Sequence, residues 1–582
     1  MLKFLTTLGS KSLHPLTNVE AVTRWMDSLP LGDSVKAITA LTKQIKEYND
    51  RPIAADKERV AVLSTLDQAA QELLEILRQQ YLQNPRMSRA VESRLWNAVS
   101  LYYQEILRAY HSHIMEYIGN PSSSKIAANI PLLTARALCY FGLDAKWSYY
   151  RYTRVNSKLW KRMHNLYHFA EYEEFETRAL KLYEAEDETS ILKLYLQSLM
   201  LETLNTGSLT PRQIYLVERW LPMLVQGIRL ESTHKPGHHV FYVNLEENRG
   251  ARRVRRIIPS ETFRYWDSSG LKDKLDALRS QLSAGVVPAK LGLTEDCKLP
   301  TCLELLERIA DYWSPIGLKR TQRASKRLDT MKSIEVVRGL GDICVNVRAD
   351  NVQSQRAQGG KVSDGLSYNE MVDVHLYGFI TQRTQTKVGQ GKKDDKVEHV
   401  IVHERWVMEN ESEAGYGAHI NDQADDWVRL GKLVGLKAEK KGHWNIGVIR
   451  RLQRTQSNQQ YVGIAVIDEH PVTLLLRAEK SEQRPLSVDG LDNVDTLDLK
   501  LPFPALYLKG AGSSAQTDAL ILQSAEFSNG RELWFNARGT IYHIRLKNVL
   551  ERGDDWLRTS FEVVGKQTIG TDNATGSRAA IG

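Results

Sequence analysis

Hydrophobic residues recur with helical spacing along the first 230 residues of the chain. In the stretch AVLSTLDQAAQELLEILRQQY the apolar side chains fall on one stripe, at Leu63, Leu66, Ala70, Leu73, Leu74, Leu77 and Tyr81. A spacing of i, i+3, i+4 and i+7 is typical of an amphipathic helix. Farther along, LTPRQIYLVERWL carries a helix start, in which Thr210 can cap, Pro211 suits the first helical position and Gln213 can complete a capping box. These patterns predict a helical domain over residues 1–230.

One helical stretch, residues 140–172, mixes tyrosine and tryptophan with arginine and lysine. Basic residues interleaved with aromatics can bind single-stranded nucleic acid by stacking. Large aromatics at helical spacing more often pack between antiparallel helices. We therefore interpret the stretch as core.

The pattern changes after about residue 235. HHVFYVNLEENRGARRVRR alternates around a turn and predicts a short hairpin, and LKDKLDALRSQL predicts a charged helix. Together they indicate a hairpin-plus-helix connector over residues 231–314. From about residue 332 short β-branched runs predict strands, in KSIEVVRGLGDICVNV, HVIVHERWVMEN, HWNIGVIRRLQR and YVGIAVID. A polar passage at about 350–397, with one strand-like run DVHLYGFITQ, is interpreted as a hairpin inserted into the first barrel.

A last block of short strands covers residues 481–568, and the Asn529-Gly530 step inside it predicts a hairpin. Residues 569–582 are polar and glycine-rich and predict a disordered tail. The fold class expected is therefore α+β and multidomain. An all-helical N-terminal half precedes small antiparallel β-barrels, either one over residues 315–480 or a second as well over 481–568.

Composition narrows the function only a little. The chain has 582 residues and a net charge of +8, with 42% hydrophobic and 25% charged residues, as in an ordinary globular protein. This charge permits an anionic partner without demanding one. Two basic segments, ARRVRR (251–256) and KRTQRASKR (319–327), could serve a nucleic-acid binder, but no RNA-binding motif accompanies them, so we do not expect nucleic acid as a partner.

The cysteines and histidines point to no metal site. Cys139, Cys297, Cys302 and Cys344 are scattered, and we expect them to be reduced thiols. The HKPGHH cluster lacks a carboxylate or cysteine at ligand spacing, so we interpret it as a solvated loop. No apolar run reaches the ~18–20 residues of a membrane span. The N-terminal stretch MLKFLTTLGSKSLHPL has no cleavage site of small residues, and we expect a cytoplasmic protein.

Two short motifs stand in and beside the first predicted barrel. The basic stretch LKRTQRASKRLD precedes its first strand and contains Arg323 and Arg327 as R-x-x-x-R. Between two later strands the chain reads NESEAGYG, which places Asn410, Ser412 and Gly415 as N-x-S-x-x-G.

Together, in this order and flanked by strands, these motifs resemble the PilZ domain, the bacterial receptor module for cyclic di-GMP. The pattern of that family is R-x-x-x-R on the segment entering a small β-barrel, then (D/N)-x-S-x-x-G between the next strands. The resemblance covers residues 315–480, with the polar passage at 350–397 accounting for the longer spacing between the motifs. It implies that cyclic di-GMP is the ligand and that no other cofactor is needed.

The chemistry of these residue types suits such a ligand. Arg323 and Arg327 can pair with phosphate oxygens and with guanine O6 and N7, or stack on a purine. Asn410 and Ser412 offer short polar side chains at a turn, and Gly415 allows close backbone approach or a positive φ. Weaker candidates for ligand contact are Arg320, Arg405, Arg450 and Arg451.

We therefore expect a cyclic di-GMP effector that passes the signal to a protein partner through its helical half. The alternative is a ligand-independent interaction scaffold with a degenerate barrel. An enzyme is the least supported option, since the chain holds no G-x-S-x-G, P-loop or H-E-x-x-H motif.

Overall fold

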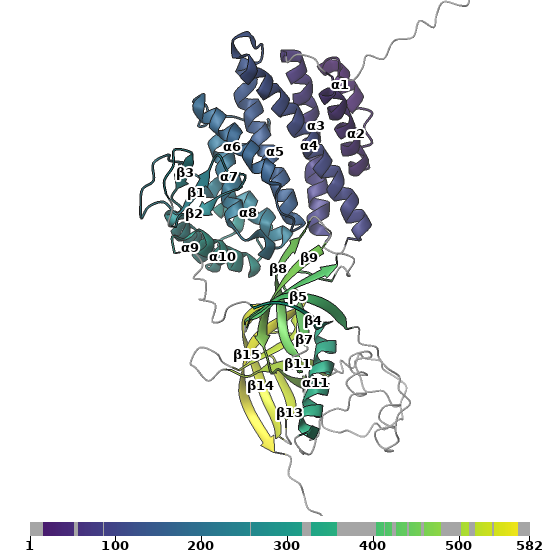
Figure 1. The fold of residues 1–582 in the computed structure, drawn as a ribbon. Coiled ribbons are helices and arrows are strands. Elements are labelled where there is room, and N and C mark those ends of the chain that lie inside the picture. The colour runs from purple at the N-terminus through teal and green to yellow at the C-terminus, as the bar shows by residue number, and fades with distance from the viewer. Residues whose placement is uncertain are drawn as a thin grey trace, which may run out of the picture. The chain divides into compact units, whose positions relative to one another are not determined.

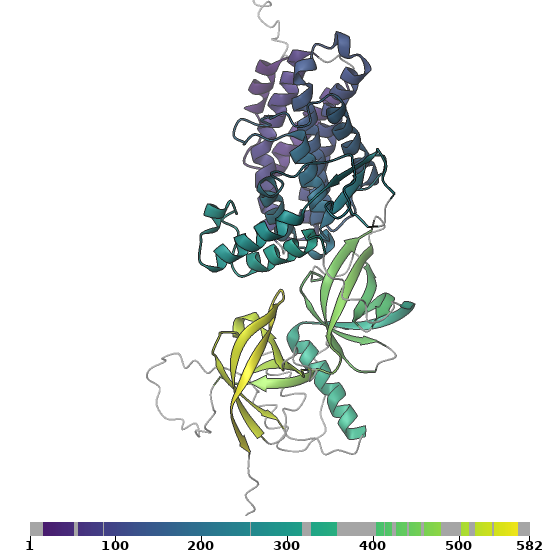
Figure 2. The same cartoon turned by 90° about the vertical axis from the view of Figure 1, so that its left-hand side faces the viewer.

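The computed structural model of the chain describes residues 16–51, 56–84, 87–255, 258–316, 328–357, 403–412, 414–421, 427–438, 442–455, 459–478, 502–510, 518–537 and 540–568. The chain forms two compact units, Met1–Gln322 with Gln453–Gln456 and Arg323–Leu452 with Ser457–Gly582. The first unit is mainly helical, and the second is built from two antiparallel barrels (Figures 1 and 2). This confirms the predicted fold class.

The helices of the first unit pack around one hydrophobic core. They are α1 (Val19–Met26), α2 (Ser34–Asn49), α3 (Lys57–Gln83), α4 (Arg89–Gly119), α5 (Ile130–Tyr150), α6 (Ser157–Tyr172), α7 (Ile191–Thr203), α8 (Pro211–Leu224), α9 (Ser269–Ser283) and α10 (Thr301–Trp313). The predicted stripe of α3 is buried from Leu63 to Leu77, and Tyr81 is partly buried against the same core. At the start of α8 the Gln213 amide donates to Thr210 Oγ1 at 3.3 Å, and the Thr210 amide donates to Gln213 Oε1 at 2.9 Å. The predicted capping box is therefore confirmed.

The aromatic stretch at residues 140–172 lies in this core. Tyr140, Trp147, Tyr150, Trp160 and Tyr167 are all buried. The interpretation as core packing is confirmed, and these rings are not available to stack on a nucleic acid.

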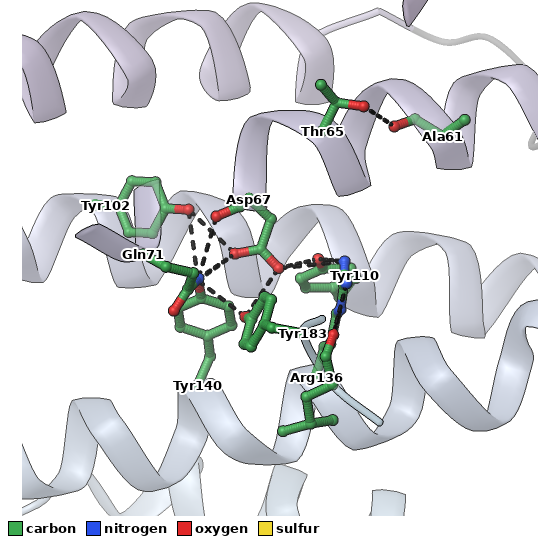
Figure 3. Close-up of polar contacts among 10 residues, drawn as sticks. Ala61, Thr65, Asp67, Gln71, Tyr102, Tyr110, Arg136, Tyr140 and Tyr183 are labelled. Carbon is green, nitrogen blue, oxygen red and sulfur yellow. Dashed lines mark hydrogen bonds and ion pairs between the residues drawn. The ribbon is translucent and has the colours of Figure 1, made fainter. Parts of the chain in front are cut away.

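A polar network is buried in the middle of the helices (Figure 3). Its centre is the fully buried carboxylate of Asp67 on α3, which accepts hydrogen bonds from the hydroxyls of Tyr110, Tyr140 and Tyr183. Arg136 Nη1 on α5 lies 3.5 Å from the same carboxylate. Burial raises the pKa of Asp67, and Arg136 together with the tyrosine hydroxyls opposes that rise. The network ties three helices and the loop before α7 together.

A small sheet in the order β2-β1-β3 covers part of the same core. Its strands are β1 (Phe241–Asn244), β2 (Arg252–Arg253) and β3 (Phe263–Trp266). The predicted hairpin is β1–β2, and β3 was not predicted. Phe241 and Trp266 belong to the helical core, as do Leu305 and Trp313 of α10.

One expectation about this region is wrong: Cys297 and Cys302 are joined by a disulfide, because the turn before α10 brings their Cα atoms to 5.3 Å. The HKPGHH loop is largely exposed from Lys235 to His238, as expected. Its last residue, His239, is buried against Tyr265, with ring centres 5.5 Å apart, and its Nδ1 accepts the Lys235 amide. No group of three or more metal-binding side chains occurs in the part of the chain that the structure describes.

The first barrel of the second unit is closed, with the strand order β4-β5-β6-β9-β8-β7. Its strands are β4 (Leu328–Arg338), β5 (Glu404–Ser412), β6 (Gly415–Asn421), β7 (Leu433–Ala438), β8 (Asn445–Arg454) and β9 (Gln459–Asp468). One prediction fails here: the segment LGDICVNV belongs to helix α11 (Leu340–Ala357) instead of a strand. This helix also occupies the first residues of the predicted polar insertion, whose strand-like run DVHLYGFITQ lies outside the described residues.

The second barrel follows with the strand order β10-β11-β12-β15-β14-β13. Its strands are β10 (Val472–Leu476), β11 (Phe503–Leu508), β12 (Ala519–Gln523), β13 (Glu532–Ala537), β14 (Thr540–Arg552) and β15 (Trp556–Thr568). A bridge between Arg477 and Trp534 brings the first and last strands together, so the barrel is nearly closed. The Asn529-Gly530 hairpin was predicted wrongly: Gly530 turns the chain at φ 81°, but β12 and β13 are separated by β15 and β14. The predicted tail, 569–582, lies outside the described residues.

Helix α11 lies between the two barrels, as the teal helix of Figure 2 shows. Its apolar residues share one buried cluster with strands of both barrels. Among the described residues of the whole chain, no helix combines the length and apolarity needed to cross a bilayer.

Candidate functional site

The β5–β6 hairpin brings the three residues of the N-x-S-x-x-G motif together. Ser412 ends β5 and pairs with Gly415, the first residue of β6. The Ser412 hydroxyl donates to the Gly415 carbonyl at 3.2 Å, which stabilises the turn. Asn410 lies two residues earlier, next to a bulge between Met408 and Asn410.

Register then sets two rows of residues across β5, β6 and β9. One row is Asn410, Gly417 and Gly463, and the next is Ser412, Gly415 and Ala465. The intervening residues Tyr416 and Ala418 are buried, so these rows lie on the outer face of the barrel. We call this surface the β5–β6–β9 face.

Glycine is required at two positions of this face. A Cβ on Gly417 would lie 2.7–2.8 Å from the side-chain oxygen and nitrogen of Asn410 and would overlap the Tyr461 hydroxyl. A Cβ on Gly415 would overlap the backbone carbonyl of Ile464. Gly415 therefore serves close packing, and it is not among the glycines with positive φ.

The amide of Asn410 is held against this glycine-lined surface. Asn410 is only 7% exposed, and its Oδ1 has no hydrogen-bond partner among the residues that the structure describes. A buried polar atom without a partner costs about 1–3 kcal/mol. Such an atom in a native fold calls for an explanation, and a donor on a ligand supplies one.

Three further side chains border the face and were not predicted. Tyr461 and His419 lie in the row beside Gly417, with ring centres 5.4 Å apart. His419 Nε2 is 3.2 Å from the Glu409 carboxylate. Of these side chains only His419 has a sequence signal: in the G-x-G-x-H alternation of residues 415–419, period two places it on the same face as Gly415 and Gly417.

The arginines of the R-x-x-x-R motif, Arg323 and Arg327, and the weaker candidate Arg320, lie outside the described residues. The adjoining strand is described: β4 starts at Leu328, pairs with Glu411 there, and pairs Asp329 with Asn410. The chain following Arg327 therefore enters the barrel beside Asn410.

The other weaker candidates differ in their surroundings. Arg405 is exposed and lies 3.8 Å from Glu335. Arg450 forms an ion pair with Glu551 of the second barrel. Arg451 lies beside the β5–β6–β9 face, since a Cβ on Gly463 would be 3.1 Å from the Arg451 Cβ.

Comparison with protein families gives two matches. Residues 20–235 match the model described as the N-terminal domain of the cyclic-di-GMP receptor FimW. Residues 345–471 match the model described as the middle PilZ domain of the same receptor, and they include every described residue of the two rows. Comparison with curated proteins and with solved structures found no match.

Proposed function

Because the chain belongs to the family of PilZ-domain cyclic-di-GMP receptors, we propose that it binds cyclic di-GMP on the β5–β6–β9 face and relays this binding to a protein partner through its helical unit. In this role the protein is a receptor and not a catalyst, needs no metal or further cofactor, and works in the cytoplasm.

The observation that carries the proposal is the row formed by Asn410, Gly417 and Gly463. Gly417 leaves the space in which the Asn410 amide lies, and we expect the unpartnered Asn410 Oδ1 to accept a hydrogen bond from a guanine N–H. Ser412 and Gly415 hold the hairpin that fixes this amide.

The two phosphates of the ligand need cations, and the segment before β4 supplies them. Arg323 and Arg327 precede Leu328, which pairs with Glu411 next to Asn410. Guanidinium groups bind phosphate bidentately and stack on purines. We therefore expect both arginines to contact the phosphates or guanines of a ligand bound on the β5–β6–β9 face.

A nucleic-acid partner is not part of the proposal. Arg253 of the basic ARRVRR segment donates to the carbonyls of Tyr312 and Ser314 and covers the ring of Phe241. Its charge stabilises the helical unit from within instead of forming an open basic patch.

Isothermal titration of the full chain with cyclic di-GMP tests ligand binding. We expect binding at micromolar concentration, and we expect Arg323→Ala and Arg327→Ala each to weaken it by more than about tenfold, or 1.4 kcal/mol. Arg552→Ala, which removes an exposed arginine of the second barrel, is the matched control and leaves affinity unchanged. A folded chain that releases no heat would instead favour the ligand-independent scaffold.

The relay is tested separately by hydrogen exchange of the helical unit. With saturating cyclic di-GMP, we expect altered exchange in peptides of residues 16–316 as well as in β5 and β6. If the chain binds the ligand but hydrogen exchange changes only in the barrel, the protein is a receptor and the proposed relay through the helical unit is wrong.

A further inference from the structure

The two barrels of the second unit are copies of one fold. Numbered in chain order, the six strands of each barrel are arranged 1-2-3-6-5-4. In the first barrel the pairs β4–β5, β4–β7, β5–β6, β6–β9 and β7–β8 are antiparallel. In the second barrel the pairs β10–β11, β11–β12, β12–β15, β13–β14 and β14–β15 are antiparallel as well. Strands β5, β6 and β9 of the first barrel therefore correspond to β11, β12 and β15 of the second.

Register makes this correspondence exact to the residue. Leu506 pairs with Ile521, which pairs with Arg558. This row corresponds to Asn410, Gly417 and Gly463 in the first barrel. The next row, formed by Leu508, Ala519 and Ser560, corresponds to Ser412, Gly415 and Ala465 in the first barrel. Where the first barrel carries the Asn, Ser and Gly of its motif, the second carries Leu506, Leu508 and Ala519.

Two of these replacements, Leu506 and Leu508, are buried beneath a helix together with Ile521, the counterpart of Gly417. Leu506, Leu508 and Ile521 are at most 6% exposed, and they share a cluster with Leu340, Ile343, Cys344 and Val347 of α11. The residues that alternate with them, such as Leu520 and Leu522, point into the barrel and form a separate cluster. Helix α11 thus covers the outer face of the second barrel at Leu506, Leu508 and Ile521.

The first barrel reaches the same helix from its other side. Gly435 of β7 lies against Ile343, and Ile446 and Val448 of β8 belong to the shared cluster. At the edge of this contact, Trp556 Nε1 donates to the Gly431 carbonyl at 2.8 Å, and Lys432 pairs with Asp554 at 2.9 Å. Helix α11 therefore packs between strands β7 and β8 of the first barrel and the outer face of the second barrel.

We propose that the second barrel is a duplicated receptor barrel whose ligand face has become the docking surface for α11. The chain therefore has a single cyclic di-GMP site, and the second barrel receives a helix where the first receives a nucleotide. Strand β4 connects the two surfaces, since its start lies beside Asn410 and its end leads through Gly339 into α11. The single-site part of this proposal rests on the proposed function, and the docking part does not.

The single-site part is tested by titrating the full chain carrying both Asn410→Ala and Ser412→Ala. Because cyclic di-GMP can bind as a stacked pair, the number of ligands per chain alone does not count sites. We expect all binding heat to vanish in the double variant. A remaining transition with part of the wild-type stoichiometry would mean that the second barrel also binds ligand.

The docking part is tested by thiol labelling, which needs no ligand. Ile521→Cys in the full chain should react at least about 100-fold more slowly with a thiol reagent than Val564→Cys, which replaces an exposed residue of the same barrel. Leu506→Cys, at a second position beneath α11, repeats the measurement if Ile521→Cys does not fold. Labelling of these buried positions as fast as Val564→Cys would overturn the docking. If the wild-type chain binds no cyclic di-GMP, the proposed function fails while this measurement still decides whether α11 covers the face.

Discussion

Asn410 of β5 lies directly opposite Gly417 of β6, and its side-chain amide fills the space that a Cβ on Gly417 would need. The hydroxyl of Tyr461 borders the same space. The position of the Asn410 amide therefore depends on glycine at residue 417, although this residue lies outside the motif.

Gly417→Ala is therefore expected to weaken cyclic di-GMP binding by about tenfold or more, since the new methyl group displaces the Asn410 amide. Titration of the folded variant measures this loss. Gly119→Ala at the end of α4, where a Cβ meets open space, is the matched control. Equal affinities of Gly417→Ala and wild type would mean that the amide position does not matter.

Exchanging the motif residue for its counterpart in the second barrel gives a sharper test. Asn410→Leu introduces the residue found at the equivalent position 506 and removes every polar contact of the amide. We expect it to abolish measurable binding, whereas Asn410→Asp, the other residue of the family pattern, keeps affinity within about tenfold. Retained binding in Asn410→Leu would exclude the amide as a ligand contact.

The adjacent residues Arg450 and Arg451 are expected to behave differently. Arg450 pairs with Glu551 of β14, whereas the Arg451 backbone and Cβ lie beside Gly463. Arg451→Ala should lower ligand affinity by about fivefold or more, and Arg450→Ala should leave it unchanged. The two variants control for each other, and the reverse ranking would place the ligand on the opposite side of β8.

The sequence predicted the elements whose pattern is local. The stripe of α3 and the capping box of Thr210 depend on residues within one helix, and both were confirmed. Helix α11 was predicted as a strand because Ile343, Val345 and Val347 alternate and are β-branched. The segment is nevertheless helical, because a helix that is apolar on more than one side buries its side chains against both barrels at once.

The candidate site divides in the same way. Asn410, Ser412 and Gly415 follow from a short motif, and the hairpin brings them together. Gly417 follows from its period-two alternation with Gly415, whereas Tyr461 and Gly463 belong to the face only through the register of β6 with β9, a pairing of residues more than forty positions apart. No local pattern specifies such a register, so Tyr461 and Gly463 could not be assigned from the sequence.

The buried network around Asp67 predicts a large effect on stability. Asp67→Ala leaves Arg136 and three tyrosine hydroxyls without their shared acceptor, and removing one partner of a buried ion pair costs about 3–5 kcal/mol. Denaturant unfolding of the full chain, followed by hydrogen exchange in α3 and α5, measures this cost. Asp276→Ala removes a surface partner of Lys272 and should cost less than about 1 kcal/mol. Similar costs for the two variants would contradict a stabilising role of the network.

His164 of α6 predicts how the helical unit responds to acid. Its Nε2 lies 2.8 Å from the Arg249 carbonyl and its Nδ1 lies 2.6 Å from the Tyr195 hydroxyl, so one neutral tautomer donates to the carbonyl and accepts from the tyrosine. Burial lowers the pKa of His164 from 6.5 to about 4.

Between these two pKa values the unfolded chain binds a proton that the folded chain does not, so stability falls as the pH decreases from about 6.5 to 4. Below about pH 4 both states are protonated and the loss ends. A shift of this size corresponds to about 3 kcal/mol.

His164→Gln removes this titration, so its free energy of unfolding should depend less on pH over that window. His168→Gln, at an exposed position of the same helix, should keep the wild-type dependence. Unfolding at several pH values, followed by hydrogen exchange in α6, measures the difference, and identical pH profiles for the two variants would contradict the role of His164.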